Sequence, residues 1–104
     1  MQVSTDSCGQ DLCYCDNAQV TCISVINPVF IRDYEIIQVY MENVQILGLS
    51  NVLKSFPNLK YLTLYNMLYF NCDWVNDIPS NVYRNIPQCR SDPGKKKIFN
   101  VIYS

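Results

Sequence analysis

The sequence predicts an α/β solenoid, a short right-handed coil in which parallel strands form a concave sheet and disulfide-bonded caps close both ends. Two observations predict this fold class. One apolar pattern occurs twice, beginning at Ile36 in the first copy and at Leu59 in the second. Six cysteines lie outside the two copies, four before them and two after. With 104 residues the chain has room for one modest core, so we expect a single domain over residues 1–104.

The clearer copy of the pattern covers residues 59–66. Its apolar residues are Leu59, Leu62 and Leu64, and Asn66 follows them. Leu62 and Leu64 have the period of two that inward-pointing residues of a strand show, while Leu59 anchors the bend before the strand. We expect the side chain of Asn66 to hydrogen-bond backbone groups of the turn, because a coil buries polar backbone that its own strand cannot satisfy.

The other copy covers residues 36–43 and places Ile36, Val39, Met41 and Asn43 at the equivalent positions. The separation of Ile36 from Leu59 resembles the spacing of leucine-rich repeats, whose coils are about 20–29 residues long. Each copy should therefore contribute one strand, and the two strands should be parallel neighbours.

The segment between the copies has the spacing of a short helix packed behind the strands. Its apolar residues, three or four positions apart, are Ile46, Leu49, Leu53 and Phe56. Residues 44–51 also fit the strand template, but they begin too soon after Ile36 to form a separate coil. We interpret them as the convex return of the first repeat.

Composition excludes several classes of function. Hydrophobic residues make up 49% of the chain and charged residues 16%, which favours a folded protein. A formal net charge of −1 gives no drive towards nucleic acid or an anionic membrane surface. No apolar run reaches the about 18–20 residues that membrane insertion requires. The polar start does not resemble a signal peptide, so if the protein is secreted, we expect this sequence to be the mature chain with an initiator Met added.

The chain also lacks histidine, which removes the commonest general base and metal ligand. The carboxylates of Asp73, Asp77 and Asp92 form no recognisable catalytic arrangement, and we expect them to cap turns. We therefore expect neither an enzyme nor a cofactor or metal site.

The four N-terminal cysteines follow the spacing C-x4-C-x-C-x6-C over residues 8–22. Extended pieces around residues 13–15 and 20–22 are separated by Asp16, Asn17 and Ala18, which indicate a hairpin turn. Such a cluster could bind zinc in a reduced compartment. Zinc sites usually show C-x2–4-C pairs, often with histidine, and because the chain offers neither two such pairs nor a histidine, we favour disulfides. Six cysteines allow many pairings, and spacing alone leaves the pairing open.

Followed by Asn27, Pro28 and the first repeat, this run resembles the cysteine-rich N-terminal cap of extracellular leucine-rich-repeat proteins. Small proteoglycans, Slit-like guidance proteins and jawless-vertebrate variable lymphocyte receptors carry such caps. The resemblance implies disulfides Cys8–Cys15 and Cys13–Cys22. A stapled hairpin of this kind would cover the apolar core that a terminal coil exposes.

Residues 70–74, Phe-Asn-Cys-Asp-Trp, resemble the start of the C-terminal cap of the same family, which usually reads N-P-F-x-C-D-C. Met67 stands where proline is usual, and Trp74 stands where the second cysteine would be. The resemblance therefore implies one disulfide, Cys72–Cys89. We expect Trp74 to pack over the last coil, as a lone tryptophan near a disulfide usually does.

The expected layout is an N-terminal cap over residues 8–35, two repeats over 36–66, a C-terminal cap over 67–90 and a tail strand within 91–104. The β-prone part of the tail is Ile98–Tyr103. We favour its pairing with the cap or the sheet edge of its own chain over pairing with another chain, since an exposed strand of this kind would promote aggregation.

Strand residues that do not point inward should line the concave face and bind another protein. They are Ile37, Gln38, Tyr40, Glu42, Lys60, Tyr61, Thr63 and Tyr65. Tyrosine is favoured in protein-recognition sites, although it also simply suits strands. The sequence thus predicts a secreted binding module with an unidentified protein partner. Richness in Asn, Ile and Tyr, typical of AT-rich viral or parasite genomes, would suit host interaction. The alternative is a structural protein that forms homodimers or larger assemblies through its tail strand or apolar ends.

Overall fold

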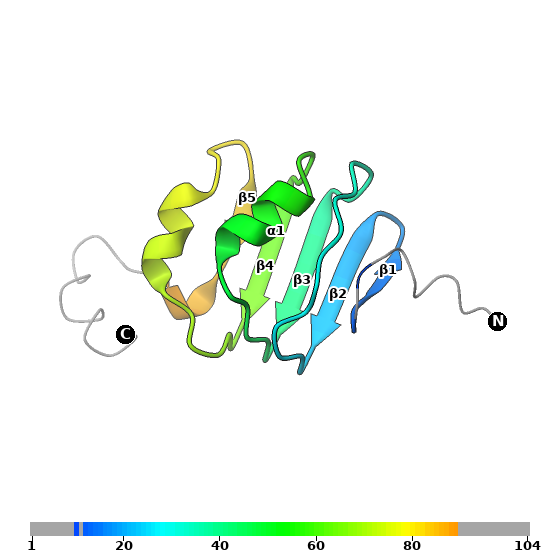
Figure 1. Ribbon diagram of the computed structural model, residues 1–104. Helices are drawn as coiled ribbons and strands as arrows, with labels where there is room; N and C mark the ends of the chain where they lie inside the picture. The colour runs from blue at the N-terminus through cyan, green and yellow to red at the C-terminus, as the bar shows by residue number, and fades with distance from the viewer. Residues whose placement is uncertain (1–9, 11, 90–104) are drawn as a thin grey trace.

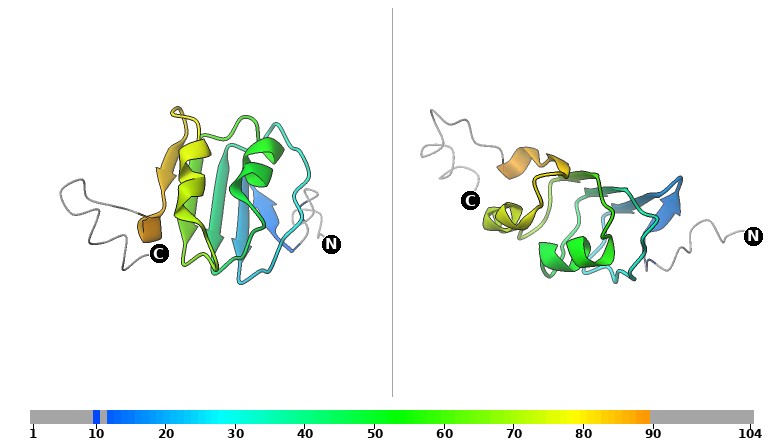
Figure 2. Two further views of the ribbon diagram at one scale, coloured as in Figure 1. Left: turned by 60° about the vertical axis from the view of Figure 1, so that its left-hand side comes forward. Right: turned by 90° about the horizontal axis from the view of Figure 1, so that it is seen from above.

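A five-stranded, mostly parallel sheet forms the body of the computed structural model, which describes residues 10 and 12–89 (Figure 1). The strands lie in chain order: β1 (Tyr14–Asp16), β2 (Gln19–Ile23), β3 (Gln38–Glu42), β4 (Tyr61–Tyr65) and β5 (Tyr83–Asn85). Strand β1 is antiparallel to β2, and every other neighbouring pair is parallel. The helices of the described residues are α1 (Leu49–Ser55) and two 3-10 helices, η2 (Cys72–Asp77) and η3 (Pro87–Cys89). Helices α1 and η2 lie over the same face of the sheet, as the view from above shows (Figure 2).

The two copies of the apolar pattern form adjacent parallel strands, as the sequence predicts. Strand β3 pairs with β4 residue for residue, so that Val39 lies beside Leu62 and Met41 beside Leu64. These are the residues that occupy equivalent positions in the two copies, so the register of the strands reproduces the alignment of the sequence pattern. Strand β2 extends this parallel sheet by pairing with β3 in the same way.

The backbone turns in the same way after each of these three strands. Ser24, Asn43 and Asn66 directly follow β2, β3 and β4, and their φ angles are 57°, 58° and 49°. Asparagine adopts this left-handed conformation more readily than most residues. The two asparagines of the sequence pattern thus suit the turn through their backbone conformation. The side-chain hydrogen bond predicted for Asn66 is not found among the described residues.

Equivalent positions of successive strands stack into the core. Val20, Val39 and Leu62 form one buried row, and Cys22, Met41 and Leu64 form the next. Helix α1 covers these rows with Leu49 and Val52, and Phe56 follows at its end. The apolar stripe predicted from the sequence is thus confirmed at Ile46, Leu49 and Phe56, which are buried. Leu53 is only partly buried, and Val52 is the fully buried residue of the helix between Leu49 and Phe56.

The N-terminal end of the sheet is a disulfide-stapled hairpin. Asn17 and Ala18, between β1 and β2, have φ angles of 52° and 67°, and two positive values suit the right-handed twist of a tight hairpin. Cys13 is bonded to Cys22, as the resemblance implied. Cys15 is disulfide-bonded as well, while Cys8, its expected partner, lies outside the described residues.

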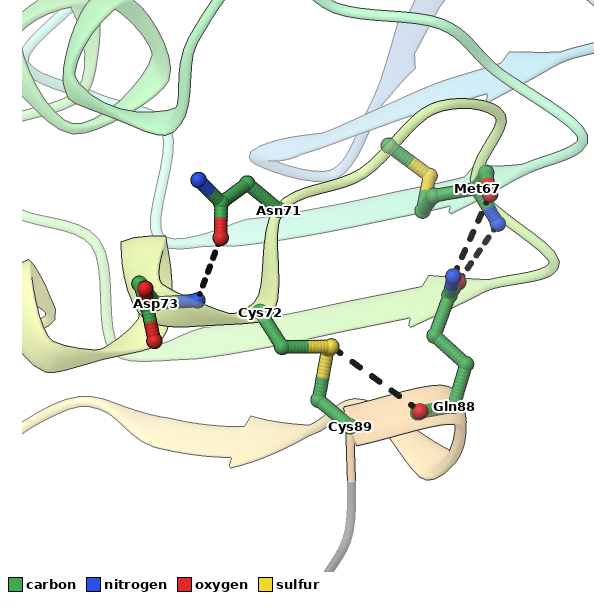
Figure 3. Close-up of a disulfide and its surroundings, with 6 residues drawn as sticks. All are labelled: Met67, Asn71, Cys72, Asp73, Gln88 and Cys89. Atoms are coloured by element: carbon green, nitrogen blue, oxygen red, sulfur yellow. Dashed lines mark hydrogen bonds between the residues drawn. A yellow bond between two sulfur atoms is a disulfide. The ribbon is translucent and has the colours of Figure 1, made fainter. Parts of the chain in front are cut away.

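The C-terminal end is closed by η2, β5 and η3. The disulfide Cys72–Cys89 joins η2 to η3, again as the resemblance implied (Figure 3). Trp74 packs against the core and meets Phe70 edge to face, with ring centroids 5.0 Å apart. Arg84 of β5 donates to backbone carbonyl oxygens of Val75, Ile78 and Pro79, at and just beyond the end of η2. These hydrogen bonds connect β5 to η2 and to the residues that directly follow it.

Two glutamine side chains satisfy backbone groups at opposite ends of the sheet. Gln10 Oε1 accepts from Ile31 N at 2.8 Å, and its Nε2 donates to Ile31 O at 3.0 Å. Gln88 binds Met67 in the same two-fold way, at 2.6 Å and 3.2 Å (Figure 3). In both places the side-chain amide bonds a backbone N–H and C=O group as a neighbouring peptide group would.

Replacing Gln88 with leucine is expected to lower the free energy of unfolding by about 1–3 kcal/mol, because both backbone groups of Met67 lose their partner beside the core. Urea unfolding measures the change. Gln38→Leu is the matched control, since Gln38 is exposed on β3. Equal stability of the Gln88→Leu and Gln38→Leu variants would contradict the capping role of Gln88.

The predicted tail strand within residues 91–104 lies outside the described residues. Among the described residues, no helix is long and apolar enough to cross a membrane.

Candidate functional site

The sheet face opposite α1 carries six of the eight residues predicted for binding. Along β3 and β4, inward residues are buried and alternate with outward residues that are half-buried or exposed. The outward residues pair across the strands as Gln38 with Tyr61, Tyr40 with Thr63, and Glu42 with Tyr65. Neighbouring strands lie about 4.8 Å apart, so these side chains form one continuous surface, named here the tyrosine face.

The other two predicted residues, Ile37 and Lys60, lie just before β3 and β4. The carbonyl oxygen of Ile37 accepts from Lys60 N at 2.8 Å and from Tyr61 N at 3.0 Å. The structure thus brings them together at the edge of the tyrosine face where the parallel strands begin.

Sequence reasoning missed the contribution of the outer strands to the tyrosine face. The register adds Thr21 and Ile23 from β2, Tyr14 from β1, and Tyr83 and Asn85 from β5. Strand β2 offered a signal in the sequence, since the apolar residues Val20 and Cys22 alternate with the polar residues Gln19 and Thr21, although Thr21 is itself buried in the structure. Strand β5 offered none, because Arg84 takes the position where an inward apolar residue would be expected.

Four tyrosines of this face pack in two pairs across neighbouring strands. The rings of Tyr40 and Tyr65 meet edge to face with centroids 5.8 Å apart, and those of Tyr61 and Tyr83 with centroids 6.3 Å apart. Edge-to-face contacts of this kind stabilise aromatic pairs beyond the area that they bury. Tyr61 is 47% exposed and Tyr83 67%, so the second pair presents a large aromatic area on the surface.

Hydrogen bonds hold the first pair in place. Tyr40 Oη donates to Glu42 Oε1 at 3.0 Å, and Asn85 Nδ2 donates to Tyr65 Oη at 3.2 Å. The hydrogen bond to Glu42 raises the pKa of Tyr40 above its ordinary value of 10.0, and desolvation and the carboxylate charge act in the same direction. The phenol of Tyr40 therefore keeps its proton to a higher pH than a free tyrosine does.

The Glu42→Gln substitution is expected to lower the pKa of Tyr40 towards 10.0, because it removes the carboxylate charge and leaves a weaker acceptor. In the native protein, the contact stabilises the fold fully below pH 10.0, and this contribution disappears as the pH rises through the raised pKa of Tyr40. NMR titration of ring-labelled tyrosine measures the pKa of Tyr40 in the native protein and in the Glu42→Gln variant. Glu35→Gln is the control, and a Tyr40 pKa that is unchanged in the Glu42→Gln variant would contradict the assignment.

Of the carboxylates expected to cap turns, Asp73 lies in the first turn of η2 and Asp77 at its end, and neither side chain accepts a backbone hydrogen bond among the described residues. At Asp73 the capping group is the preceding asparagine, because Asn71 Oδ1 accepts from Asp73 N at 2.9 Å. Asp92 lies outside the described residues. Among the described residues, no three His, Cys, Asp or Glu side chains are grouped closely enough to hold a metal ion. The chemistry that the tyrosine face offers is aromatic contact area with phenol, amide and carboxylate groups.

Comparisons with protein-family models, curated proteins and solved structures found no match for this chain.

Proposed function

We propose that this chain is a minimal extracellular leucine-rich-repeat solenoid that binds a protein partner through its tyrosine face. Three parallel strands in residue-for-residue register support the repeat assignment, and β3 pairs with β4 in the alignment of the two sequence copies. Disulfides at both ends of the sheet support an extracellular location, since such bonds persist mainly in oxidising compartments.

The observation that carries the binding role is the concentration of tyrosine on the face that no helix covers in the described chain. All five strands meet there, and four of them contribute the five tyrosines Tyr14, Tyr40, Tyr61, Tyr65 and Tyr83. Tyrosine provides a large amphipathic contact area at low cost in conformational entropy, and it is enriched among residues that dominate binding energy.

A photo-crosslinking amino acid placed at Tyr83 tests this role against one placed at Tyr34. Both positions are well exposed, at 67% and 59%, but Tyr34 lies in the loop before β3, away from the tyrosine face. With a panel of extracellular proteins, an adduct is expected from position 83 and none from position 34. Adducts from both positions, or from neither, would contradict the proposed face.

The protein found in the adduct then allows an affinity measurement. Tyr61→Ala is expected to weaken its binding by about tenfold or more, as truncation of a central aromatic residue commonly does. Tyr61 is preferable to Tyr40 because it is 47% exposed and makes no side-chain hydrogen bond among the described residues. Tyr69→Ala is the control, since Tyr69 is 87% exposed in the turn after β4. Equal affinities of the two variants would count against the proposal.

Self-assembly is the second candidate, and exposed apolar side chains in the loops favour it. Ile26 is 55% exposed, Leu47 75% and Leu68 39%, and burying these side chains against another copy of the chain would remove their apolar area from water. Light scattering on the full chain and on a chain ending at Pro93 distinguishes the possibilities. Dimers of the full chain that become monomers on truncation would indicate assembly through the tail. Monomers in both samples would eliminate this candidate.

A further inference from the structure

Glu42 is the one carboxylate on the central strands of the tyrosine face. It lies at the end of β3, beside Ile23 of β2 and Tyr65 of β4 in the sheet register. It is half-buried, and it makes no ion pair with any lysine or arginine of the described chain. Its charge is therefore available to a cation from outside these residues.

The surroundings of this carboxylate are fixed by contacts that leave its charge uncompensated. Tyr40 Oη donates to Glu42 Oε1, which orients the carboxylate on the face. The ring of Tyr65 is held by Tyr40 edge to face and by Asn85 at its hydroxyl. A carboxylate beside two ordered tyrosine rings matches a guanidinium group, because arginine binds carboxylates through paired N–H donors and stacks on aromatic rings.

We propose that Glu42, with Tyr40 and Tyr65, forms a subsite for an arginine side chain of the protein partner. This inference rests on the proposed function and specifies the chemistry of the partner: a protein that presents an exposed arginine to the end of the face where β3 and β4 finish. The paired rings of Tyr61 and Tyr83, where β4 and β5 begin, provide the neutral contact area for the residues around that arginine.

A small-molecule titration tests the subsite without requiring the partner. N-acetyl-arginine amide is added to the isotope-labelled full chain, and NMR shifts are followed at Tyr40, Glu42 and Tyr65. N-acetyl-citrulline amide is the comparison ligand, since it keeps the shape of arginine and lacks its charge. We expect saturable shifts at these three residues with the arginine ligand only.

Glu42→Gln is the decisive variant, because glutamine still offers an acceptor to Tyr40 Oη while the charge is removed. It should weaken arginine binding at least tenfold, whereas Glu35→Gln, which removes a charge outside the face, should leave it unchanged. Equal shifts from citrulline, or undiminished binding by Glu42→Gln, would overturn the subsite.

Failure of this inference is distinguishable from failure of the proposed function. If Tyr61→Ala weakens binding of the protein partner but the arginine ligand does not bind, the binding role of the tyrosine face is supported and the arginine subsite is wrong. If the arginine ligand binds at Glu42 but crosslinking and Tyr61→Ala show no partner on the face, the protein-binding role falls.

Discussion

Leu62→Ala is expected to lower the free energy of unfolding by about 3–5 kcal/mol, the largest effect of any change considered for this chain. Leu62 is fully buried on β4, where it continues the row of Val20 and Val39. Truncation removes buried methyl groups and leaves a cavity between two strands and α1 that the stacked rows cannot close. The total free energy of unfolding of a small domain is about 5–15 kcal/mol, so such a loss is severe. Urea unfolding measures it.

Thr63→Ala is the matched control for this prediction. Thr63 is the next residue of the same strand, but its side chain points to the tyrosine face. Its truncation should change stability by at most about 0.5 kcal/mol. Similar losses from the two variants would contradict the inward and outward assignment of β4, and with it the position of every tyrosine on that strand.

Removing the C-terminal disulfide by Cys72→Ser with Cys89→Ser is expected to lower the free energy of unfolding by about 3 kcal/mol. The two cysteines have a sequence separation of 17, and a crosslink that closes a loop of this size restricts the unfolded chain by about that amount. It also holds η3, and so the Gln88 side chain that binds Met67, against the last strands. Urea unfolding of the oxidised protein and the double variant measures the difference.

Adding Gln88→Leu to the double serine variant tests whether the disulfide and the glutamine act as one cap. Because the bond positions the residue next to Gln88, the combined loss should be smaller than the sum of the separate losses. Additive losses would show that the two contacts stabilise the end of the sheet independently. A double serine variant as stable as the native chain would contradict the capping role of the disulfide.

The central strands could be predicted from the sequence because their pattern reflects a repeated geometry. Each copy places two inward residues on a strand and an asparagine on a left-handed turn, so the alignment of the copies becomes the register of β3 with β4. The tyrosine face followed from the same alternation. This is why six of the eight predicted residues lie on it, with Ile37 and Lys60 at its edge.

The ends of the sheet could not be predicted in the same detail because no repetition describes them. Gln19 of β2 pairs with Gln38, which in turn pairs with Tyr61, so the step from β2 to β3 is shorter than the step between the two copies. Strand β5 places Arg84 opposite Leu62 and is recognisable only through its pairing with β4. Nor do the two capping glutamines follow a local pattern, since each binds a backbone residue 21 positions away.

The most direct test of the whole account is an NMR measurement of nuclear Overhauser contacts between ring-labelled tyrosines. The account predicts contacts from Tyr40 to Tyr65 and from Tyr61 to Tyr83, whose ring centroids lie 5.8 Å and 6.3 Å apart. Both pairs require the parallel register of β3, β4 and β5 and a shared face. Contacts from Tyr40 only to residues near it in sequence would contradict the stacked strands and the binding surface built on them.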